Sequence, residues 1–145
     1  MGPLRLINDL PADFLVMNGD ILTDLDYGAA FRLHEQHRQR FTIFAASRRQ
    51  KIDFGVLHVD GCSRLSGFEE KPELEYVVSM GVYAMSREIV HKIPVGTPYG
   101  FDQLMLQCLT EGVPVNVQRH GGYWLDIGRP DDYERANDEW PRHAG

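Results

Sequence analysis

The feature that most constrains the fold is a pair of short apolar runs separated by a segment of helix length. Residues 14–17 form a continuous apolar run that ends in a turn at residues 18–20, and residues 41–46 form a second run. Runs of this length are typical of strands buried on both faces of a sheet. Between them, the acidic residues 23–26 can cap a helix predicted over about 27–40. The pattern predicts a strand–helix–strand unit and therefore an α/β fold.

The remaining segments extend this unit into a mixed sheet. Glycine-bounded runs predict a hairpin from strands at 55–61 and 64–69, and further strands at 76–85 and 113–117. Helices are expected at 102–111, with its inward face at Leu104, Met105, Cys108 and Leu109, and at about 130–140, opened by Pro130. No linker interrupts the pattern, so residues 1–145 are predicted to form a single α/β domain.

Composition excludes several classes of function. The net charge is −6, and the densest basic cluster, Arg48, Arg49 and Lys51, is predicted to be a solvated surface loop. Nucleic acid is therefore not expected as a partner. No apolar stretch approaches the length of a membrane-spanning helix, so no membrane partner is expected. Cys62 and Cys108 lack metal-ligand spacing and indicate reduced residues of a cytoplasmic protein.

Two aspartates are the first candidates for chemistry. Asp20 and Asp126 each follow an apolar run and lie near a glycine, Gly19 or Gly128. Carboxylates at strand ends lie where open α/β sheets bind ligands, and two that converge would suit Mg²⁺. Each could equally be a turn former or a helix cap.

Glu70 and Lys71 are the second candidates. A lysine that follows a strand and precedes Pro72 could reach a phosphate, and a neighbouring carboxylate could accept hydrogen bonds from sugar hydroxyls. An exposed charged turn explains the same residues. His34 and His37 lie three residues apart on the first predicted helix, where they are expected on its surface rather than in a metal site.

The order of these segments resembles a known family. The segments, in chain order, are Asn18-Gly19-Asp20, Phe54-Gly55-Val56, Phe68-Glu69-Glu70-Lys71-Pro72, Met80-Gly81-Val82-Tyr83 and Trp124-Leu125-Asp126-Ile127-Gly128. Together they are similar to the sugar-1-phosphate nucleotidyltransferases, which make NDP-sugars. The likeness runs from about residue 14 to 136, and the ending Asp-Ile-Gly-Arg-Pro is most similar to mannose-1-phosphate guanylyltransferases and related heptose-phosphate enzymes.

The resemblance implies a role for each matching residue. Asp20 and Asp126 would hold the catalytic Mg²⁺, Lys71 would contact the phosphate of the sugar 1-phosphate, and Glu70 would bind sugar hydroxyls. Gly55 and Gly81 would let the backbone approach the sugar. The implied reaction joins an NTP to a sugar 1-phosphate in a Rossmann-like fold, of the GDP-mannose type.

One departure from the family pattern concerns the nucleotide. Family members open with a glycine-rich loop containing Gly-Thr-Arg and a later lysine, and this chain has no such segment. We therefore expect it to correspond to the C-terminal part of the family's domain, with reduced or no activity alone. A non-catalytic sugar-phosphate-binding or regulatory module is an alternative, as is a subunit completed by a separate N-terminal chain. A second copy of the chain, in a homo-oligomer, is expected to cover the exposed edge of the sheet.

Overall fold

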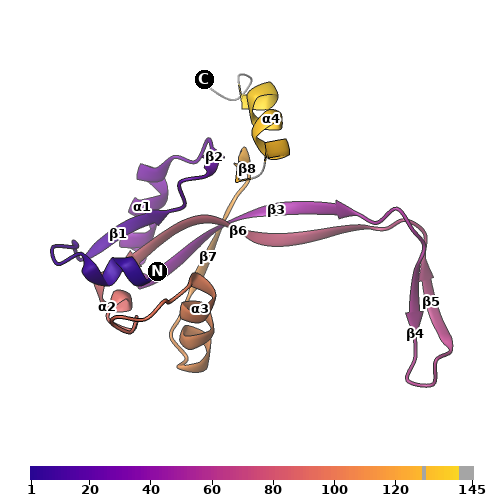
Figure 1. Ribbon diagram of the computed structural model, residues 1–145, viewed down its shortest axis with the longest axis horizontal. Coiled ribbons are helices and arrows are strands. Elements are labelled where there is room, and N and C mark those ends of the chain that lie inside the picture. The colour runs from indigo at the N-terminus through magenta and orange to yellow at the C-terminus, as the bar shows by residue number, and fades with distance from the viewer. Residues whose placement is uncertain (129, 141–145) are drawn as a thin grey trace.

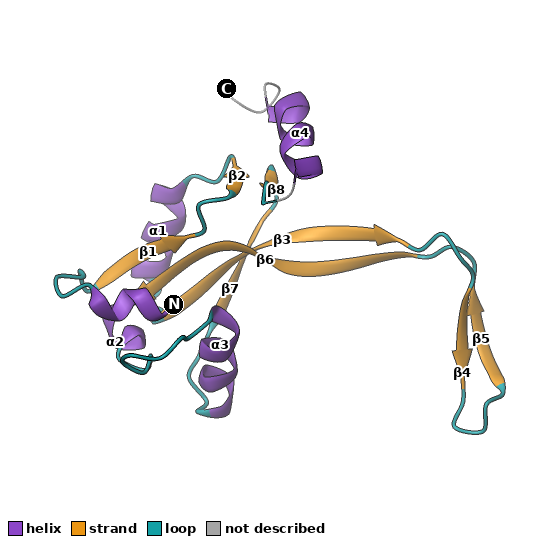
Figure 2. Ribbon diagram, viewed as in Figure 1, coloured by secondary structure: helices purple, strands orange, loops and turns teal. Residues whose placement is uncertain are grey.

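The computed structural model of the chain describes residues 1–128 and 130–140. The strands are β1 (Asp13–Met17), β2 (Ile21–Thr23), β3 (Phe41–Lys51), β4 (Val56–Val59), β5 (Leu65–Glu69), β6 (Glu73–Ser86), β7 (Asn116–His120) and β8 (Trp124–Asp126). The helices are the 3₁₀ helix η1 (Gly2–Leu6) and the α-helices α1 (Tyr27–Gln36), α2 (Arg87–Val90), α3 (Phe101–Thr110) and α4 (Pro130–Glu139). The α/β class predicted from the sequence is confirmed (Figure 1, Figure 2). No helix among these residues is long and apolar enough to cross a membrane.

The central sheet is mixed, as predicted, and has the order β1-β6-β3-β7. Strand β6 runs antiparallel to both of its neighbours, whereas β3 and β7 are parallel. The predicted strand–helix–strand unit corresponds to β1, α1 and β3, with β6 inserted between its two strands. β1 is an edge of the described sheet, and only Phe14 of its side chains is buried. The prediction that this strand is buried on both faces was therefore wrong.

Helices cover both faces of the sheet near its centre (Figure 1). Alternate side chains of β6 supply two apolar clusters, as the twofold repeat of a strand requires. One cluster holds Met80, Val82 and Ala84 with Ala30 of α1. The other cluster packs α2 and α3 against the opposite face; its buried members are Phe14, Phe41, Tyr83, Met85, Ile89, Val90, Ile93, Leu104 and Cys108. The two clusters fix the rigid body from which the functional segments extend.

Strands β3 and β6 continue beyond this body as a long two-stranded ribbon. Their pairing runs from Phe41 opposite Met85 to Lys51 opposite Glu73, with a shift in register between Phe44 and Ala45. At its far end the ribbon carries the antiparallel β4–β5 hairpin, which confirms the hairpin predicted from the sequence (Figure 1). Here the ribbon and hairpin together are named the arm, residues 47–79. The cluster Arg48, Arg49 and Lys51 therefore lies on a paired strand and not in a loop, because β3 continues past its apolar part.

Several element ends differ from the prediction for local reasons. Helix α1 ends at Gln36, before the predicted end, because Arg38 adopts a left-handed φ of 51° that a helix cannot continue. Strand β7 begins at Asn116 rather than at residue 113. In α3 the predicted inward face is only partly correct, since Leu109 is exposed while Leu104 and Cys108 are buried. The predicted caps at Asp26 and after α3 are present: Asp26 accepts a hydrogen bond from the Ala29 amide, and Gly112 has φ 64°.

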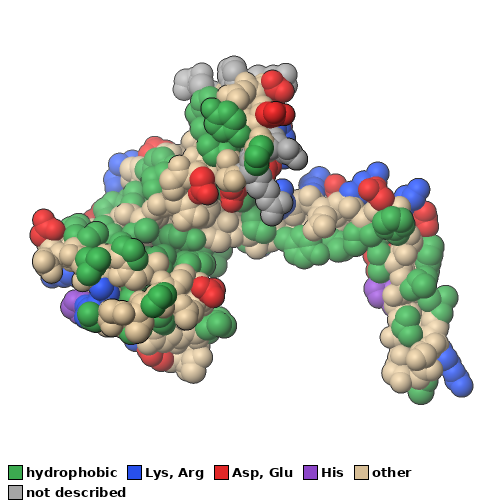
Figure 3. Space-filling view, viewed as in Figure 1, with side chains coloured by type: hydrophobic (Ala, Val, Ile, Leu, Met, Phe, Trp, Pro, Cys, Tyr) green, Lys and Arg blue, Asp and Glu red, His purple; other side chains and the backbone are tan. Residues whose placement is uncertain are grey.

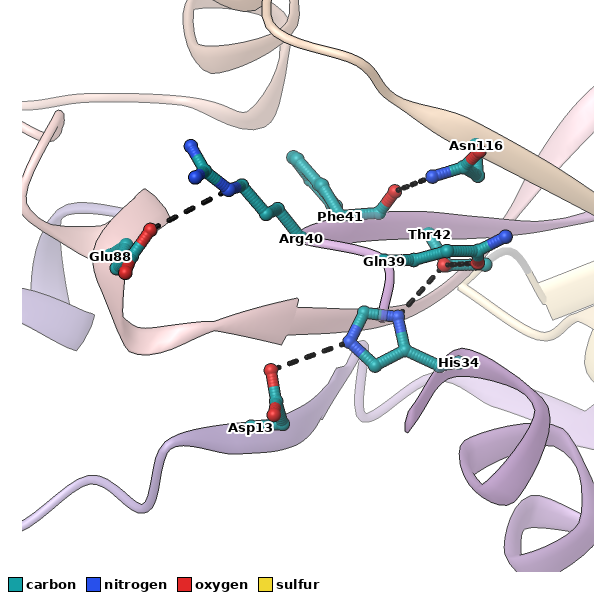
Figure 4. Close-up of polar contacts among 8 residues, drawn as sticks. All are labelled: Asp13, His34, Gln39, Arg40, Phe41, Thr42, Glu88 and Asn116. Atoms are coloured by element: carbon teal, nitrogen blue, oxygen red, sulfur yellow. Dashed lines mark hydrogen bonds and ion pairs between the residues drawn. The ribbon is translucent and has the colours of Figure 1, made fainter. Parts of the chain in front are cut away.

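His34 is buried, which overturns its predicted place on the helix surface. Its Nδ1 lies 2.8 Å from the Thr42 hydroxyl, which donates in turn to Gln39 Oε1 at 2.6 Å. On the other side of the ring, Nε2 lies 3.6 Å from Asp13 Oδ1 (Figure 4). A buried imidazole requires such polar neighbours, and here they connect α1 to β1 and β3. His34 is thus a structural residue of the sheet–helix interface.

Candidate functional site

The carboxylates of Asp20 and Asp126 approach a common point beside Gly128. Asp20 Oδ2 lies 3.0 Å, and Asp126 Oδ1 3.1 Å, from the position that a Cβ atom on Gly128 would occupy. The two aspartates are more than 100 positions apart in the sequence, so only the fold can bring them together. The structure therefore places this predicted pair side by side.

Pairing of two short strands holds the aspartates in position. β2 and β8 are antiparallel, with Ile21 opposite Asp126 and Thr23 opposite Trp124. The Ile127 amide donates to the Asp20 carbonyl at 2.8 Å, and the Gly128 amide donates to Asp126 Oδ1 at 2.9 Å. These bonds fix the backbone on either side of both carboxylates. They also leave Asp126 Oδ2 without a backbone partner among the described residues.

The donor set fits a hard divalent cation. Both groups are carboxylates, and magnesium is usually held by one or two carboxylates together with water and substrate oxygens. A side chain at Gly128 would fill the space between the two carboxylates, which glycine leaves open. Within the part of the chain that the structure describes, no third His, Cys, Asp or Glu joins the pair. A metal held here would therefore keep most of its coordination positions for other ligands.

Gly81 contacts Asn18, which lies two residues before Asp20 in the turn that follows β1. The Asn18 amide donates to the Gly81 carbonyl at 2.8 Å, and the Asn18 side chain would collide with any Cβ on Gly81. Gly81 has φ 75°, a conformation that favours glycine. Gly81 was predicted to let a ligand approach the backbone closely. In the structure, the group that approaches it closely is the Asn18 side chain. A cavity of about 260 Å³ adjoins this turn, lined mainly by Met1, Pro3, Leu4, Val16, Asn18, Tyr83 and Phe101.

The other three predicted residues, Gly55, Glu70 and Lys71, cluster in the arm where the hairpin meets the ribbon. Glu70 Oε2 lies 3.4 Å from the Cβ position of Gly55, and the Lys71 ammonium lies 4.0 Å from Glu70 Oε1. Both charged side chains are more than half exposed. Lys71 has a left-handed φ of 45°, which is uncommon outside glycine. The turn therefore presents an ammonium group and a carboxylate together to solvent.

The structure separates the predicted residues into two groups. Asp20, Asp126 and Gly81 lie at the body, whereas Gly55, Glu70 and Lys71 lie at the far end of the ribbon (Figure 1). Figure 1 shows the hairpin directed away from β2 and β8. A ligand held by both groups would require the arm to approach the carboxylates.

Comparison with known proteins identifies the family. Residues 4–142 match the nucleotidyl transferase family. The chain belongs to this family. The likeness inferred from five short segments of sequence is therefore confirmed over nearly the whole chain.

The family members most similar in sequence include enzymes of nucleotide-sugar synthesis. A Sulfolobus acidocaldarius protein, provisionally named mannose-1-phosphate guanyltransferase, is 34% identical over 94% of this chain and 38% of its own length. The mannose-1-phosphate guanylyltransferase catalytic subunit beta of Danio rerio is 27% identical over 91% of this chain and 38% of its own length. The chain thus spans well under half the length of these curated relatives.

Solved structures confirm the fold. HddC from Yersinia pseudotuberculosis superposes with a TM-score of 0.60 at 22% identity, over 95% of this chain and 59% of that one. A second structure of HddC, complexed with GMP-PN, superposes with a TM-score of 0.59 at 21% identity. At this level of identity the likeness shows a shared fold and no more.

Sequence reasoning missed a polar pair between the ends of β2 and β7. His120 Nε2, at the end of β7, lies 2.7 Å from Asp24 Oδ1, after β2. Hydrogen bonding to the backbone at Tyr123 lowers the pKa of Asp24, and His120 lowers it further by its hydrogen bond and charge. A side chain at Gly122 would overlap the Asp24 carboxylate. No sequence signal marks this pair, because its members are 96 positions apart.

Proposed function

We propose that this chain supplies the metal-binding carboxylates and the sugar-phosphate contacts of a nucleotidyltransferase that forms an NDP-sugar. The reaction is attack by a phosphate oxygen of the sugar 1-phosphate on the α-phosphate of an NTP, with pyrophosphate as the leaving group. The convergence of Asp20 and Asp126 beside Gly128 carries the proposal. The names of the sequence relatives favour mannose 1-phosphate and GTP as the substrates.

In this proposal Asp20 and Asp126 hold Mg²⁺. The bound ion neutralises charge that develops on the phosphate oxygens. The residues of the chain position it: the β2–β8 pairing fixes both carboxylates, and Gly128 keeps the space between them open. Phosphoryl transfer depends on positioning and charge neutralisation, so no nucleophile from the protein is required.

Lys71 and Glu70 bind the sugar 1-phosphate in the same proposal. The Lys71 ammonium neutralises the phosphate charge, and Glu70 accepts hydrogen bonds from sugar hydroxyls close to the Gly55 backbone. These residues lie apart from the aspartates, so substrate binding would draw the arm toward the body. The Gly81 backbone, one turn from Asp20, would then lie against the sugar.

A second candidate is a sugar-phosphate-binding module without transferase activity. It is favoured by the separation of the two groups of residues between the body and the far end of the ribbon. Transfer also requires donors to the NTP phosphates, and removing one such donor typically costs about 10²–10³ in rate. We therefore expect the 145-residue chain to show little or no nucleotidyl transfer by itself.

Calorimetry with mannose 1-phosphate and Mg²⁺ tests the binding step. We expect weak binding that Lys71→Ala abolishes, while Lys51→Ala, a similar charge loss at the same end of the ribbon, leaves it unchanged. Asp126→Asn should abolish Mg²⁺ binding. Unchanged sugar-phosphate binding in Lys71→Ala would mean that the turn at Lys71 does not bind the phosphate.

A pyrophosphate-release assay tests activity and separates the two candidates. It would use mannose 1-phosphate or glucose 1-phosphate with each NTP in turn. Robust turnover by the chain alone would exclude the binding-module candidate. It would also contradict the expectation of reduced activity.

A further inference from the structure

A basic pocket lies between the arm and helix α4, apart from the turn at Lys71. It is lined by Ser47, Arg48, Arg49, Trp124 and Arg135 and encloses about 260 Å³. Residues from β3, β8 and α4 meet there, so the pocket is a product of the fold. Arg48 and Arg49, which the sequence predicted to lie in a solvated surface loop, line this pocket.

The pocket concentrates positive charge in a chain whose net charge is −6. Of its five described lining residues, three are arginines and none is acidic. Arg48 forms no ion pair or side-chain hydrogen bond with any residue in the described part of the chain. Among the described residues, Arg49 pairs with Glu73 Oε2 alone, at 4.0 Å. Arg48 therefore has no carboxylate partner within the described part of the chain, and a bound anion would supply the charge that neutralises it.

Two walls of the pocket are held in place. Arg135 pairs with Asp132 at 3.7 Å and with Glu139 at 3.4 Å along α4, so its guanidinium is positioned from both sides. Trp124 Nε1 donates to the Met80 carbonyl at 2.9 Å, and the indole packs against the apolar cluster beneath α1. The Ser47 hydroxyl adds a neutral donor. Figure 3 shows basic side chains along the β3 side of the ribbon near α4.

We propose that this pocket binds the phosphate group of a small phosphate monoester, with the ring of the ester against Trp124. Arginine forks match phosphate oxygens in geometry and charge, and a fixed indole offers a face on which a sugar or nucleoside ring can stack. The site is separate from Lys71, and the proposal holds whether or not the chain takes part in nucleotidyl transfer.

Ribose 5-phosphate is a suitable probe, with ribose and inorganic phosphate as its two halves. The titrations use the full chain carrying Trp140→Phe, so that Trp124 is its one remaining tryptophan. EDTA at constant ionic strength prevents metal-bridged binding at the aspartates. We expect ribose 5-phosphate to change Trp124 fluorescence saturably, inorganic phosphate to compete with it, and ribose to have no effect.

Charge-removing variants locate the bound phosphate. Arg48→Gln and Arg135→Gln should each raise the Kd at least tenfold, because each removes a charge-assisted hydrogen-bond donor. Arg64→Gln, with the same charge change in the hairpin turn, is the matched control and should leave the Kd unchanged. Calorimetry with ribose 5-phosphate should also show weaker binding by Arg48→Gln and Arg135→Gln than by Arg64→Gln.

Three results would overturn the proposal. The first is an absence of saturable binding at millimolar concentrations. The second is an equal loss in Arg64→Gln, which would indicate a general charge effect. The third is binding that Lys71→Ala abolishes and Arg48→Gln does not, which would assign the phosphate to the proposed substrate turn and leave the basic pocket without a ligand.

Discussion

Gly81 connects backbone conformation to the candidate site. Its φ of 75° is strained for any residue with a side chain, and the side-chain nitrogen Nδ2 of Asn18 lies 2.8 Å from where a Cβ would be. We expect Gly81→Ala to lower the free energy of unfolding by about 1–3 kcal/mol, measured by urea denaturation. Gly61→Ala is the control, because that glycine has open space around it. Equal midpoints for the two variants would show that the turn adapts without strain.

The sequence predicted that Asp20 and Asp126 converge, but it did not predict that Glu70 and Lys71 lie apart from them. Asp20 and Asp126 stood out because each follows an apolar run and lies near a glycine, and the structure brings them together. The same kind of signal selected Lys71 and Glu70, which lie at the other end of a long ribbon. A local sequence pattern reports that a residue lies in a turn, whereas its distance from another turn depends on strand length and register. Residues 47–51 of β3 are exposed and polar, so no hydrophobic pattern in the sequence indicated how far the strand continues.

A polar pair, Asp24 and His120, joins the end of β2 to the end of β7. The folded-state pKa of Asp24 is lowered, so the carboxylate stabilises the fold above its unfolded pKa, and this stability is lost as pH falls through the folded pKa. We expect Asp24→Asn to be less stable than wild type near neutrality, with the difference shrinking below about pH 4. Urea midpoints measured across this pH range test the prediction. A difference that does not change with pH would mean that the charge of Asp24 is irrelevant.

Secondary structure was predicted well where periodicity was strong and poorly where strands were short. The hairpin and the three longer α-helices were found near their observed positions. The short strands β2 and β8 were missed as strands, because three residues carry no periodic signal. Their pairing is tertiary, since β8 lies about 100 positions beyond β2 in the chain. These two strands are nevertheless the ones that hold the carboxylates.

At the scale of the whole molecule, the body and the arm differ in how they are stabilised. The body has two apolar clusters under its helices, whereas the β4–β5 hairpin exposes large apolar side chains, including Leu57 at 61% and Phe68 at 57% (Figure 3). A two-stranded hairpin is marginally stable in water without a surface to pack on. β1 also has an unpaired edge among the described strands. Both features favour association with another polypeptide.

We expect the purified chain to self-associate through the apolar side of the hairpin, with a second copy as the partner. Leu57 and Phe68 lie directly opposite each other in the β4–β5 register, so they share one face. Burial of side chains of this size contributes about 1.5–3 kcal/mol each, so replacing both with lysine should weaken association at least tenfold. Sedimentation velocity over a concentration series measures the effect, with His58→Lys as the control, because His58 follows Leu57 on β4 and so lies on the opposite face of the hairpin. A wild-type chain that stays monomeric at the highest attainable concentration would contradict the prediction, and the hairpin would then require a different polypeptide to cover it.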